Sequence, residues 1–331
     1  CAFLLGVVKW LGNHEGFDEK FTSEFSDGFE AVANRAAATD WNDIVALSGV
    51  SQEEIEKVAE VYKNSKGTIF CWAMGITHVE GGVDCVRMIA NTAIARGMIG
   101  RKGAGLLPLR GHSNVQGMGT VGVVPILKGK MAEAIERELS VTLPKKKPNF
   151  QGDTMACMHA SKRGEIDYAM CLGGNLLGAN PNTRFAIDAM SKIKFVSYIS
   201  TTLNKGHFLG RGSETVVLPA LARDEEEQIT TQESMFNFVR RSSGGMRRHV
   251  GPQSEVNIIA ELAHSSIGVI DWEQFQSHDA IRQLIATCVD GFNPNQEHQI
   301  EGRTFHEPKF PTASGKVIAH DVEARAPIEI H

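Results

Sequence analysis

The sequence predicts an α/β fold built on parallel sheets. Amphipathic helical segments alternate with short apolar runs, and two of those runs end in glycine, at Gly75 and at Gly173-Gly174. Helix, apolar strand and glycine turn in this order are typical of parallel α/β sheets, where ligands bind at the carboxyl ends of the strands. We therefore expect two βα units, each with a glycine turn at a ligand-binding edge.

The first unit is expected within residues 51–100. SQEEIEKVAEVYKN begins with Ser51 and Glu54 at the spacing of a capping box, and its apolar residues recur at helical intervals. The run TIFCWAMG predicts a buried strand that ends at Gly75. GGVDCVRMIANTAIARGMIG then predicts a helix with an apolar face formed by Val83, Val86, Ala90 and Ala93.

The second unit is expected to begin with a helix over residues 153–162. The run IDYAMCLGGN predicts a buried strand, and Asn180-Pro181 predicts the N-cap and first turn of the next helix. KFVSYIS and TVVLPA predict two further strands, and SEVNIIAELAHSS predicts a later helix.

Composition and charge exclude several classes of protein. A net charge of −5 gives no reason to expect nucleic acid or an anionic membrane as a partner. A local group of four arginines does not change this expectation: Arg240, Arg241, Arg247 and Arg248. No aromatic residues lie among them, which favours a surface or phosphate-facing role over nucleic-acid binding. The apolar runs are far shorter than the ~20 residues of a membrane-spanning helix, so no direct membrane insertion is expected.

The chain has no features of a secretory signal, which predicts a cytoplasmic protein. It begins with Cys1 and ends in EARAPIEIH, so we expect a segment of a longer chain. The 6 cysteines include no CxxC pair, so we assign no metal ligand within the segment and expect reduced, mostly buried thiols.

The stretch LPLRGHSNVQGMGTVG, residues 107–122, contains four glycines, and ordering such a loop costs conformational entropy. Arg110 is either an ordinary surface arginine or a planar donor for an anion. His112 is either a hydrogen-bonded loop histidine or a proton carrier. Asn114 and Gln116 either hold the loop to the rest of the chain or recognise a heterocycle.

Neither glycine turn matches a known nucleotide fingerprint. AMGITHVEGG and CLGGNLLGAN lack GxGxxG, and the chain contains no GxxxxGK[ST]. Each turn alone is either an ordinary connection or a phosphate cradle. Two turns together with the long loop favour a large ligand with more than one phosphate group.

Over residues 67–265 the sequence resembles the molybdopterin-dependent oxidoreductases of the formate dehydrogenase type. The resemblance is carried by GMIGRKGAGLLPLRGHSNVQGMGTVG, MCLGGNLLGANPNT, ETVVLPA and TTQESMFNF. It implies Rossmann-like units of the dimethyl sulfoxide reductase-type fold in an incomplete chain. The implied domains are residues 1–115, part of one cofactor-binding domain, 116–225, a dinucleotide-binding unit, and 226–331, a return segment leading to a C-terminal barrel.

The resemblance implies molybdenum bis(molybdopterin guanine dinucleotide) as cofactor, with molybdenum or tungsten left open. It implies two-electron oxidation or reduction of a small, formate-like substrate, with electrons passing to a 4Fe-4S cluster and on to a partner protein. The cluster ligands and the metal ligand would lie upstream. It implies catalytic roles for Arg110 and His112, and cofactor contacts from Gly75, Thr77, Gly111, Asn114, Gln116, Gly173, Gly174, Asn175, Thr201 and Thr202.

The sequence departs from the family at two positions. His112 stands where well-known formate dehydrogenases have glutamine, and Ser197-Tyr198 stands where an acidic residue is expected before Thr201. Two alternatives remain: a non-catalytic homologue of the same fold, as in the large iron–sulfur subunit of respiratory complex I, and a plain α/β nucleotide-binding domain. The intact RGHSNVQG favours the catalytic subunit, since a scaffold does not require Arg110.

Overall fold

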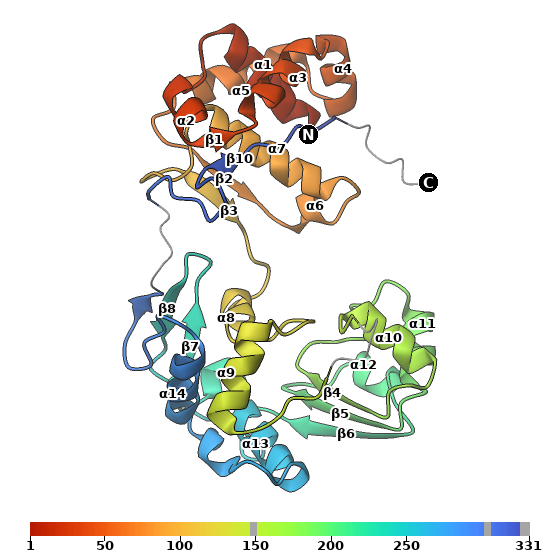
Figure 1. The fold of residues 1–331 in the computed structure, drawn as a ribbon. Helices are drawn as coiled ribbons and strands as arrows, with labels where there is room; N and C mark the ends of the chain where they lie inside the picture. Colours follow the sequence, from red (N-terminus) through yellow and green to blue (C-terminus); the bar gives the residue numbers. More distant parts are fainter. Residues whose placement is uncertain (146–150, 301–305, 325–331) are drawn as a thin grey trace. The chain divides into compact units, whose positions relative to one another are not determined.

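A computed structural model describes residues 1–145, 151–300 and 306–324 (Figure 1). The described residues form two compact units, one of residues 1–113 with 306–324 and the other of residues 114–145 with 151–300. The sequence predicted domain boundaries at 115 and 225 from the expected cofactor-binding roles of the segments. The compactness of the units does not test those roles, so these boundaries stay a prediction. None of the helices in the described residues combines the length and apolar character that a bilayer crossing requires.

The first unit is a helical layer over short parallel strands. Its helices are α1 (Ala2–Asn13), α2 (Glu19–Glu24), α3 (Phe29–Ala38), α4 (Trp41–Ser48), α5 (Gln52–Asn64), α6 (Met74–Thr77) and α7 (Gly82–Ala95). Its strands pair in parallel, β1 (Ser26–Asp27) with β10 (Val317–Ile318) and β2 (Ile69–Trp72) with β3 (Gly105–Pro108).

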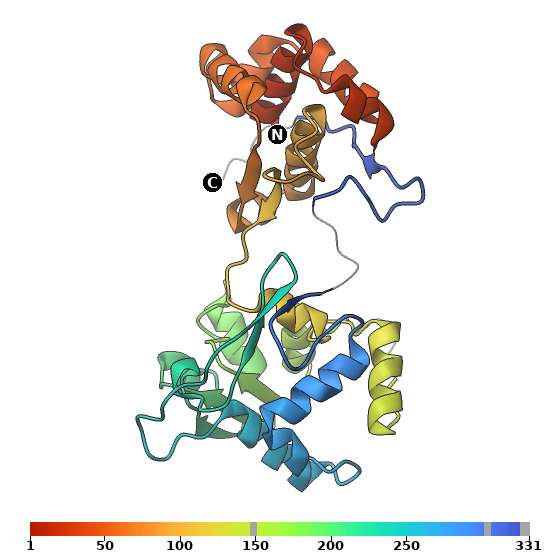
Figure 2. The same ribbon diagram turned by 90° about the vertical axis from the view of Figure 1, so that its left-hand side faces the viewer.

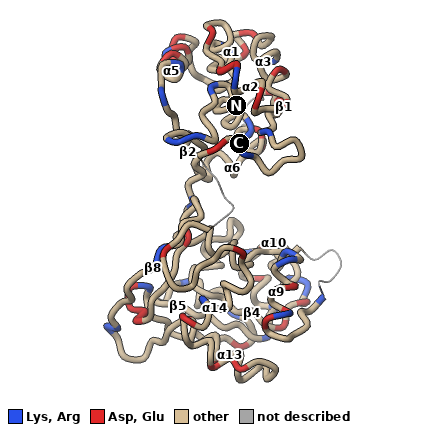
Figure 3. Tube along the Cα trace, turned by 60° about the vertical axis from the view of Figure 1, so that its left-hand side comes forward, with Lys and Arg blue, Asp and Glu red and all other residues tan. Residues whose placement is uncertain are grey.

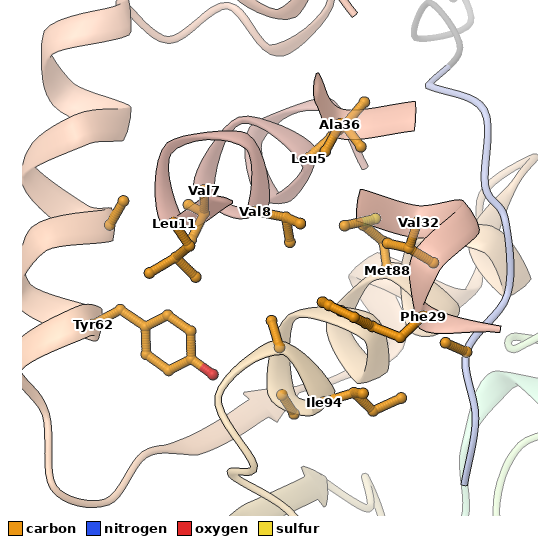
Figure 4. Close-up of a cluster of buried hydrophobic side chains, with 14 of the residues drawn as sticks. Leu5, Val7, Val8, Leu11, Phe29, Val32, Ala36, Tyr62, Met88 and Ile94 are labelled. Carbon is orange, nitrogen blue, oxygen red and sulfur yellow. The ribbon is translucent and has the colours of Figure 1, made fainter. Parts of the chain in front are cut away.

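The core of this unit forms around α1, whose Leu5, Val8 and Leu11 are fully buried together with Met88 of α7 (Figure 4). Helix α1 can approach its neighbours closely because it has a glycine at position 6. A Cβ atom there would lie 2.9 Å from Ile55 and 3.0 Å from Ile44. Removing apolar side chains of this size from water provides most of the stabilisation of such a core.

Helix α5 confirms the capping prediction. The Ser51 hydroxyl accepts the backbone N–H of Glu54, and the Glu54 carboxylate accepts the backbone N–H of Ser51. The predicted apolar face of α7 is wrong at Val83, which is 67% exposed, and right at Ala93, which is fully buried; Val86 and Ala90 are half-buried. Met88 and the residues from Asn91 to Ala95 are buried as well. Several elements pack around the second half of α7, so residues on more than one of its faces are buried there.

The segment 306–324 returns to the first unit and packs on α7, as the blue trace in Figure 2 shows. The side chain of Asn91 is 1% exposed; its Nδ2 donates to the carbonyl of His320 (2.7 Å), and its Oδ1 accepts the His320 N–H (3.1 Å). Arg35 adds a two-pronged ion pair with Asp321. The buried amide of Asn91 therefore fixes the return segment to α7, although more than 200 residues separate the two in sequence.

The second unit contains a parallel sheet in the order β4-β5-β6 and a smaller antiparallel sheet in the order β7-β8-β9. The strands are β4 (Tyr168–Leu172), β5 (Phe195–Ser200), β6 (Glu214–Pro219), β7 (Thr231–Glu233), β8 (Phe238–Arg241) and β9 (His298–Gln299). The helices are α8 (Val115–Thr120), α9 (Gly129–Leu139), α10 (Thr154–Lys162), α11 (Thr183–Met190), α12 (Lys205–Leu209), α13 (Glu255–Ser266) and α14 (His278–Cys288). The expected parallel α/β arrangement is confirmed.

Two cores enclose β5. On one face Val196 and Tyr198 pack with Met190 of α11, and on the other Ile199 packs with Ile258 of α13. The prediction that the strands before both glycine turns are buried is wrong. In β4, Tyr168, Met170 and Leu172 are 44–50% exposed, and in β2 Ile69 is 55% exposed. The reason is position, because both strands lie at sheet edges within the described residues.

The predicted start of α11 is also wrong, by two residues. The N-cap is Asn182, whose Oδ1 accepts the backbone N–H of Phe185 (3.0 Å). Asn180 instead accepts the N–H of Asn182, so Asn180 and Pro181 form the turn that precedes the cap. Both asparagines suit an N-cap, and only the local backbone decides which one is used.

Replacing Asn91 by alanine should free the return segment. We expect Asn91→Ala to lower the free energy of unfolding by roughly 1–3 kcal/mol, because it removes both hydrogen bonds between the buried amide and the backbone of His320. Urea denaturation measures this. Asn64→Ala, at the exposed end of α5, is the control and should change stability by less than about 0.5 kcal/mol. Equal effects of the two substitutions would contradict this role of Asn91.

Candidate cofactor-binding turns

The double-glycine turn follows β4 directly. Gly173 and Gly174 have φ angles of 62° and 63°, a left-handed conformation that L-residues with side chains rarely adopt. A Cβ atom at either position would meet nothing within 4 Å. The backbone conformation therefore favours glycine here, and the space beside the turn is open to a ligand that needs close approach to the main chain.

Parallel pairing brings the turns after β4 and β5 together. The N–H of Gly173 donates to the carbonyl of Ile199 (2.8 Å) in the neighbouring strand. The Asn175 Oδ1 accepts the N–H of Gly178 (2.8 Å) and lies against the start of α12, where a Cβ on Gly206 would be 2.0 Å from this oxygen. Asn175 thus joins the double-glycine turn to the loop after β5, which is a positioning role; its predicted cofactor contact stays a prediction.

Thr201 and Thr202 lie in that second loop and are exposed. The Ser200 hydroxyl donates to the carbonyl of Thr202 (3.0 Å), and Asn204 caps α12 by accepting the N–H of Gly206 (2.7 Å). The structure therefore brings Thr201 and Thr202 to the same edge of the sheet as Gly173 and Gly174.

Sequence reasoning missed the residues that support this loop. His207 is buried, and its Nδ1 accepts the backbone N–H of Asn204 (3.2 Å). The ring of His207 lies 4.7 Å from that of Tyr198, whose hydroxyl donates to the carbonyl of Gly210 (2.5 Å). Burial raises the pKa of the Tyr198 hydroxyl, which keeps it a hydrogen-bond donor. The run NKGH carried the signal: an N-cap residue followed three positions later by a polar side chain.

The first unit contains the other glycine turn. Gly75 and Thr77 lie in the short helix α6, directly after β2, and both are exposed. A Cβ atom on Gly75 would meet nothing within 4 Å. Gly82, which begins α7, packs against this turn so closely that a Cβ there would lie 2.8 Å from the carbonyl oxygen of Thr77. Helix α7 therefore supports the backbone of the turn.

The loop with Arg110 begins at the same edge of the first unit. Strand β3 pairs with β2, and the N–H of Leu109 donates to the carbonyl of Trp72 (2.7 Å). Arg110, Gly111 and His112 follow, all exposed, and a Cβ on Gly111 would lie 3.4 Å from the methyl group of Met74 in α6. The structure thus brings the Arg110–His112 loop next to the Gly75 turn.

Asn114 belongs to the second unit and has a left-handed φ of 61°. Its Oδ1 accepts the backbone N–H of Glu233 (2.9 Å), and the Glu233 carboxylate accepts the amide of Asn237 (2.6 Å). Of the two roles considered for Asn114, the structure shows that it holds the start of α8 to β7. Gln116 lies half-buried in α8. A cofactor contact from either residue stays a prediction.

Two arginines of the cluster, Arg247 and Arg248, are paired with the acidic run 224–227. Arg248 donates to Asp224 (2.9 Å) and to Glu225 (3.3 Å), and Arg247 lies 3.8 Å from Glu227. The hydrogen bond from Arg248 lowers the pKa of the Asp224 carboxyl. Figure 3 shows basic and acidic residues interspersed along both units. Within the described residues, no three His, Cys, Asp or Glu side chains are close enough together to hold a metal ion.

No protein-family model matches the chain. It is 30% identical over 318 residues to an uncharacterized oxidoreductase of Mycobacterium tuberculosis, an alignment that covers 90% of this chain and 40% of that protein. It is 28% identical over 240 residues to the putative formate dehydrogenase YrhE of Bacillus subtilis, covering 70% of this chain and 24% of that protein. The chain spans about two fifths of the length of the first of these relatives.

Among solved structures, acetylene hydratase from Pelobacter acetylenicus superposes with a TM-score of 0.63 at 18% identity, covering 96% of this chain and 47% of that enzyme. The chain therefore has a fold found in that enzyme. Its sequence relatives include proteins named as oxidoreductases and putative formate dehydrogenases.

Adding a methyl group at the double-glycine turn should reduce both the stability of the fold and ligand binding, and a control variant separates the two effects. We expect Gly174→Ala to lower the free energy of unfolding by roughly 1–2 kcal/mol, since the left-handed conformation disfavours alanine. Gly164→Ala is the matched control, because Gly164 has a φ of 74°, equally open surroundings, and a position before β4 at the opposite end of the strand.

Both variants should lose similar stability in thermal unfolding, and only Gly174→Ala should also reduce the pterin recovered from purified protein after acid release. Equal pterin contents in the two variants would show that the open space beside Gly174 does not receive a pterin ligand.

Proposed function

We propose that this chain is part of the catalytic subunit of a molybdopterin-dependent oxidoreductase of the formate dehydrogenase type. The proposal rests chiefly on the open double-glycine turn of Gly173 and Gly174, set beside the exposed threonines Thr201 and Thr202 at one sheet edge. The names of the sequence relatives support an oxidoreductase, and the resemblance of RGHSNVQG and its neighbouring motifs supports the molybdopterin class.

The residues present suit a bis(molybdopterin guanine dinucleotide) cofactor. Such a group carries two pyrophosphates, and in each unit a glycine turn that follows a parallel strand, at Gly75 and at Gly173-Gly174, would leave an added Cβ atom with nothing within 4 Å. The main-chain N–H of Gly174 and the hydroxyls of the nearby Thr201 and Thr202 would donate to one dinucleotide, and Gly173 would shape the turn that lets the ligand approach. Gly75, with its neighbours Thr77 and Gly111, would contact the other half. When bound, the cofactor supplies two-electron redox chemistry that side chains alone do not provide.

Arg110 would bind and orient the substrate. A guanidinium offers two parallel N–H donors, which match a carboxylate such as formate. His112, two residues away in the same exposed loop, would accept or deliver a proton near the substrate. The loop lies beside the Gly75 turn, so both side chains would lie near cofactor held there.

We further propose that the ligands of the metal and of the iron–sulfur cluster are provided by residues outside this chain. We propose that electrons pass to a 4Fe-4S cluster and then to a partner protein, and that the enzyme is cytoplasmic. Molybdenum is the metal proposed.

Substitution of Arg110 separates substrate orientation from cofactor loading. We expect Arg110→Ala in the full-length enzyme to lower turnover per bound molybdenum by at least roughly 100-fold, since a preorganised charged donor contributes several kcal/mol to such a step. Arg110→Lys should recover only part of this rate, because a lysine lacks the paired donors. Molybdenum content by mass spectrometry should match that of the parent enzyme.

Arg247→Ala, which removes an exposed arginine near Glu227, is the control and should leave turnover unchanged. If the Arg110 variants lose molybdenum while turnover per molybdenum stays at the parent value, Arg110 binds the cofactor and does not orient the substrate.

A further inference from the structure

The thiols of Cys1 and Cys85 lie in contact. Their Sγ atoms are 3.1 Å apart, although 84 residues separate them in sequence. Cys1 directly precedes α1 and Cys85 lies in the first turn of α7. The expectation of mostly buried thiols is wrong, because Cys71 is exposed and the other five cysteines are only half-buried.

The two helices that carry these thiols are fixed in a common core. Leu5 and Val8 of α1 and Met88 of α7 are all buried in it, as Figure 4 shows. The pairing of Cys1 with Cys85 is therefore a consequence of how α1 packs on α7. To form a disulfide the sulfur atoms would approach by about 1 Å, to the bonding distance of ~2.05 Å.

We propose that Cys1 and Cys85 form a redox-active dithiol that low-molecular-weight disulfides oxidise to an intramolecular disulfide. This modification site is independent of the cofactor function proposed above. Both residues are only half-buried, as reaction with an oxidant from solution such as glutathione disulfide requires.

The reaction proceeds by two thiol–disulfide exchanges. One cysteine loses its proton and attacks the small disulfide, whose S–S bond breaks and releases one thiol. The second cysteine then loses its proton and attacks the protein sulfur of the mixed disulfide, releasing the second thiol. Two electrons pass from the cysteines to the oxidant, and the two protons end on the released thiols.

The other cysteines provide a contrast. Burial raises the pKa of the Cys157 and Cys171 thiols, which disfavours the reactive thiolate. Cys71 is exposed on β2. Within the described residues, hydrogen-bonding contact between two cysteine sulfurs is found only for Cys1 and Cys85.

Oxidation would join α1 to the helix that supports the Gly75 turn. Cys85 lies three residues after Gly82, which packs on the carbonyls of Ile76 and Thr77. A disulfide would also close a long loop of the unfolded chain, which raises stability by restricting the unfolded state. The oxidised protein should therefore unfold at a higher temperature than the reduced one.

The test incubates the full chain in mixtures of glutathione and glutathione disulfide, alkylates the remaining thiols, and maps the peptides by mass spectrometry. We expect a Cys1–Cys85 cross-linked peptide that increases with the disulfide fraction and disappears when glutathione is restored. Cys85→Ser should instead leave Cys1 carrying a stable mixed disulfide with glutathione. Cys71→Ser is the control and should form the cross-link as the parent does.

Thermal unfolding gives a second measurement. Oxidation should raise the unfolding midpoint of the parent and of Cys71→Ser by several degrees, and should not raise that of Cys85→Ser. The proposal is overturned if Cys1 and Cys85 remain free thiols, or both end as mixed disulfides, under conditions in which Cys71 is modified by glutathione.

Discussion

The parallel pairing of β4 with β5 determines where the candidate site of the second unit forms. Parallel strands end at the same edge of a sheet, so the turns after both strands emerge side by side. The hydrogen bond from Gly173 to Ile199 continues the ladder into the turn itself. Without this register, Gly173-Gly174 and Thr201-Thr202 would be separate surface loops. The first unit repeats the arrangement on a smaller scale, where β2 and β3 bring the Gly75 turn next to Arg110.

These turns are stabilised by neighbouring side chains that need not contact a ligand themselves. Asn175 contacts the start of α12, while Asn204 and His207 stabilise the loop after β5. In the first unit, Gly82 allows α7 to pack directly on the backbone of the Gly75 turn. Such supports let glycine-rich backbone stay ordered although glycine loses more conformational entropy than other residues on folding.

The sequence predicted correctly those features that depend on interactions between residues close together in the chain. The capping box of Ser51 with Glu54 and the apolar strand at 195–200 depend on neighbours in sequence, and both are confirmed. The exposure of β4 and of Val83 in α7 depends on which elements lie beside them, so the sequence pattern alone gave the wrong result at these residues.

Long-range contacts left no sequence signal at all. Neither the Asn91 contact with His320 nor the approach of Cys1 to Cys85 follows from spacing, because each depends on how distant segments pack. For the site, the sequence indicated correctly that the two glycine turns follow strands. It did not indicate strand β3, whose pairing with β2 brings the Arg110 loop next to the Gly75 turn. It did not indicate that Asn114 binds the backbone of β7, since an asparagine in a glycine-rich loop suits either role.

The most direct test of the proposed function is metal and pterin analysis of the full-length protein produced in a host that makes the cofactor. Molybdenum would be measured by mass spectrometry and guanine nucleotide after acid release. The account predicts about one molybdenum and about two guanine nucleotides per chain, as a bis(dinucleotide) cofactor requires. A protein that contains neither molybdenum nor pterin would contradict it, and would favour a non-catalytic homologue of the same fold.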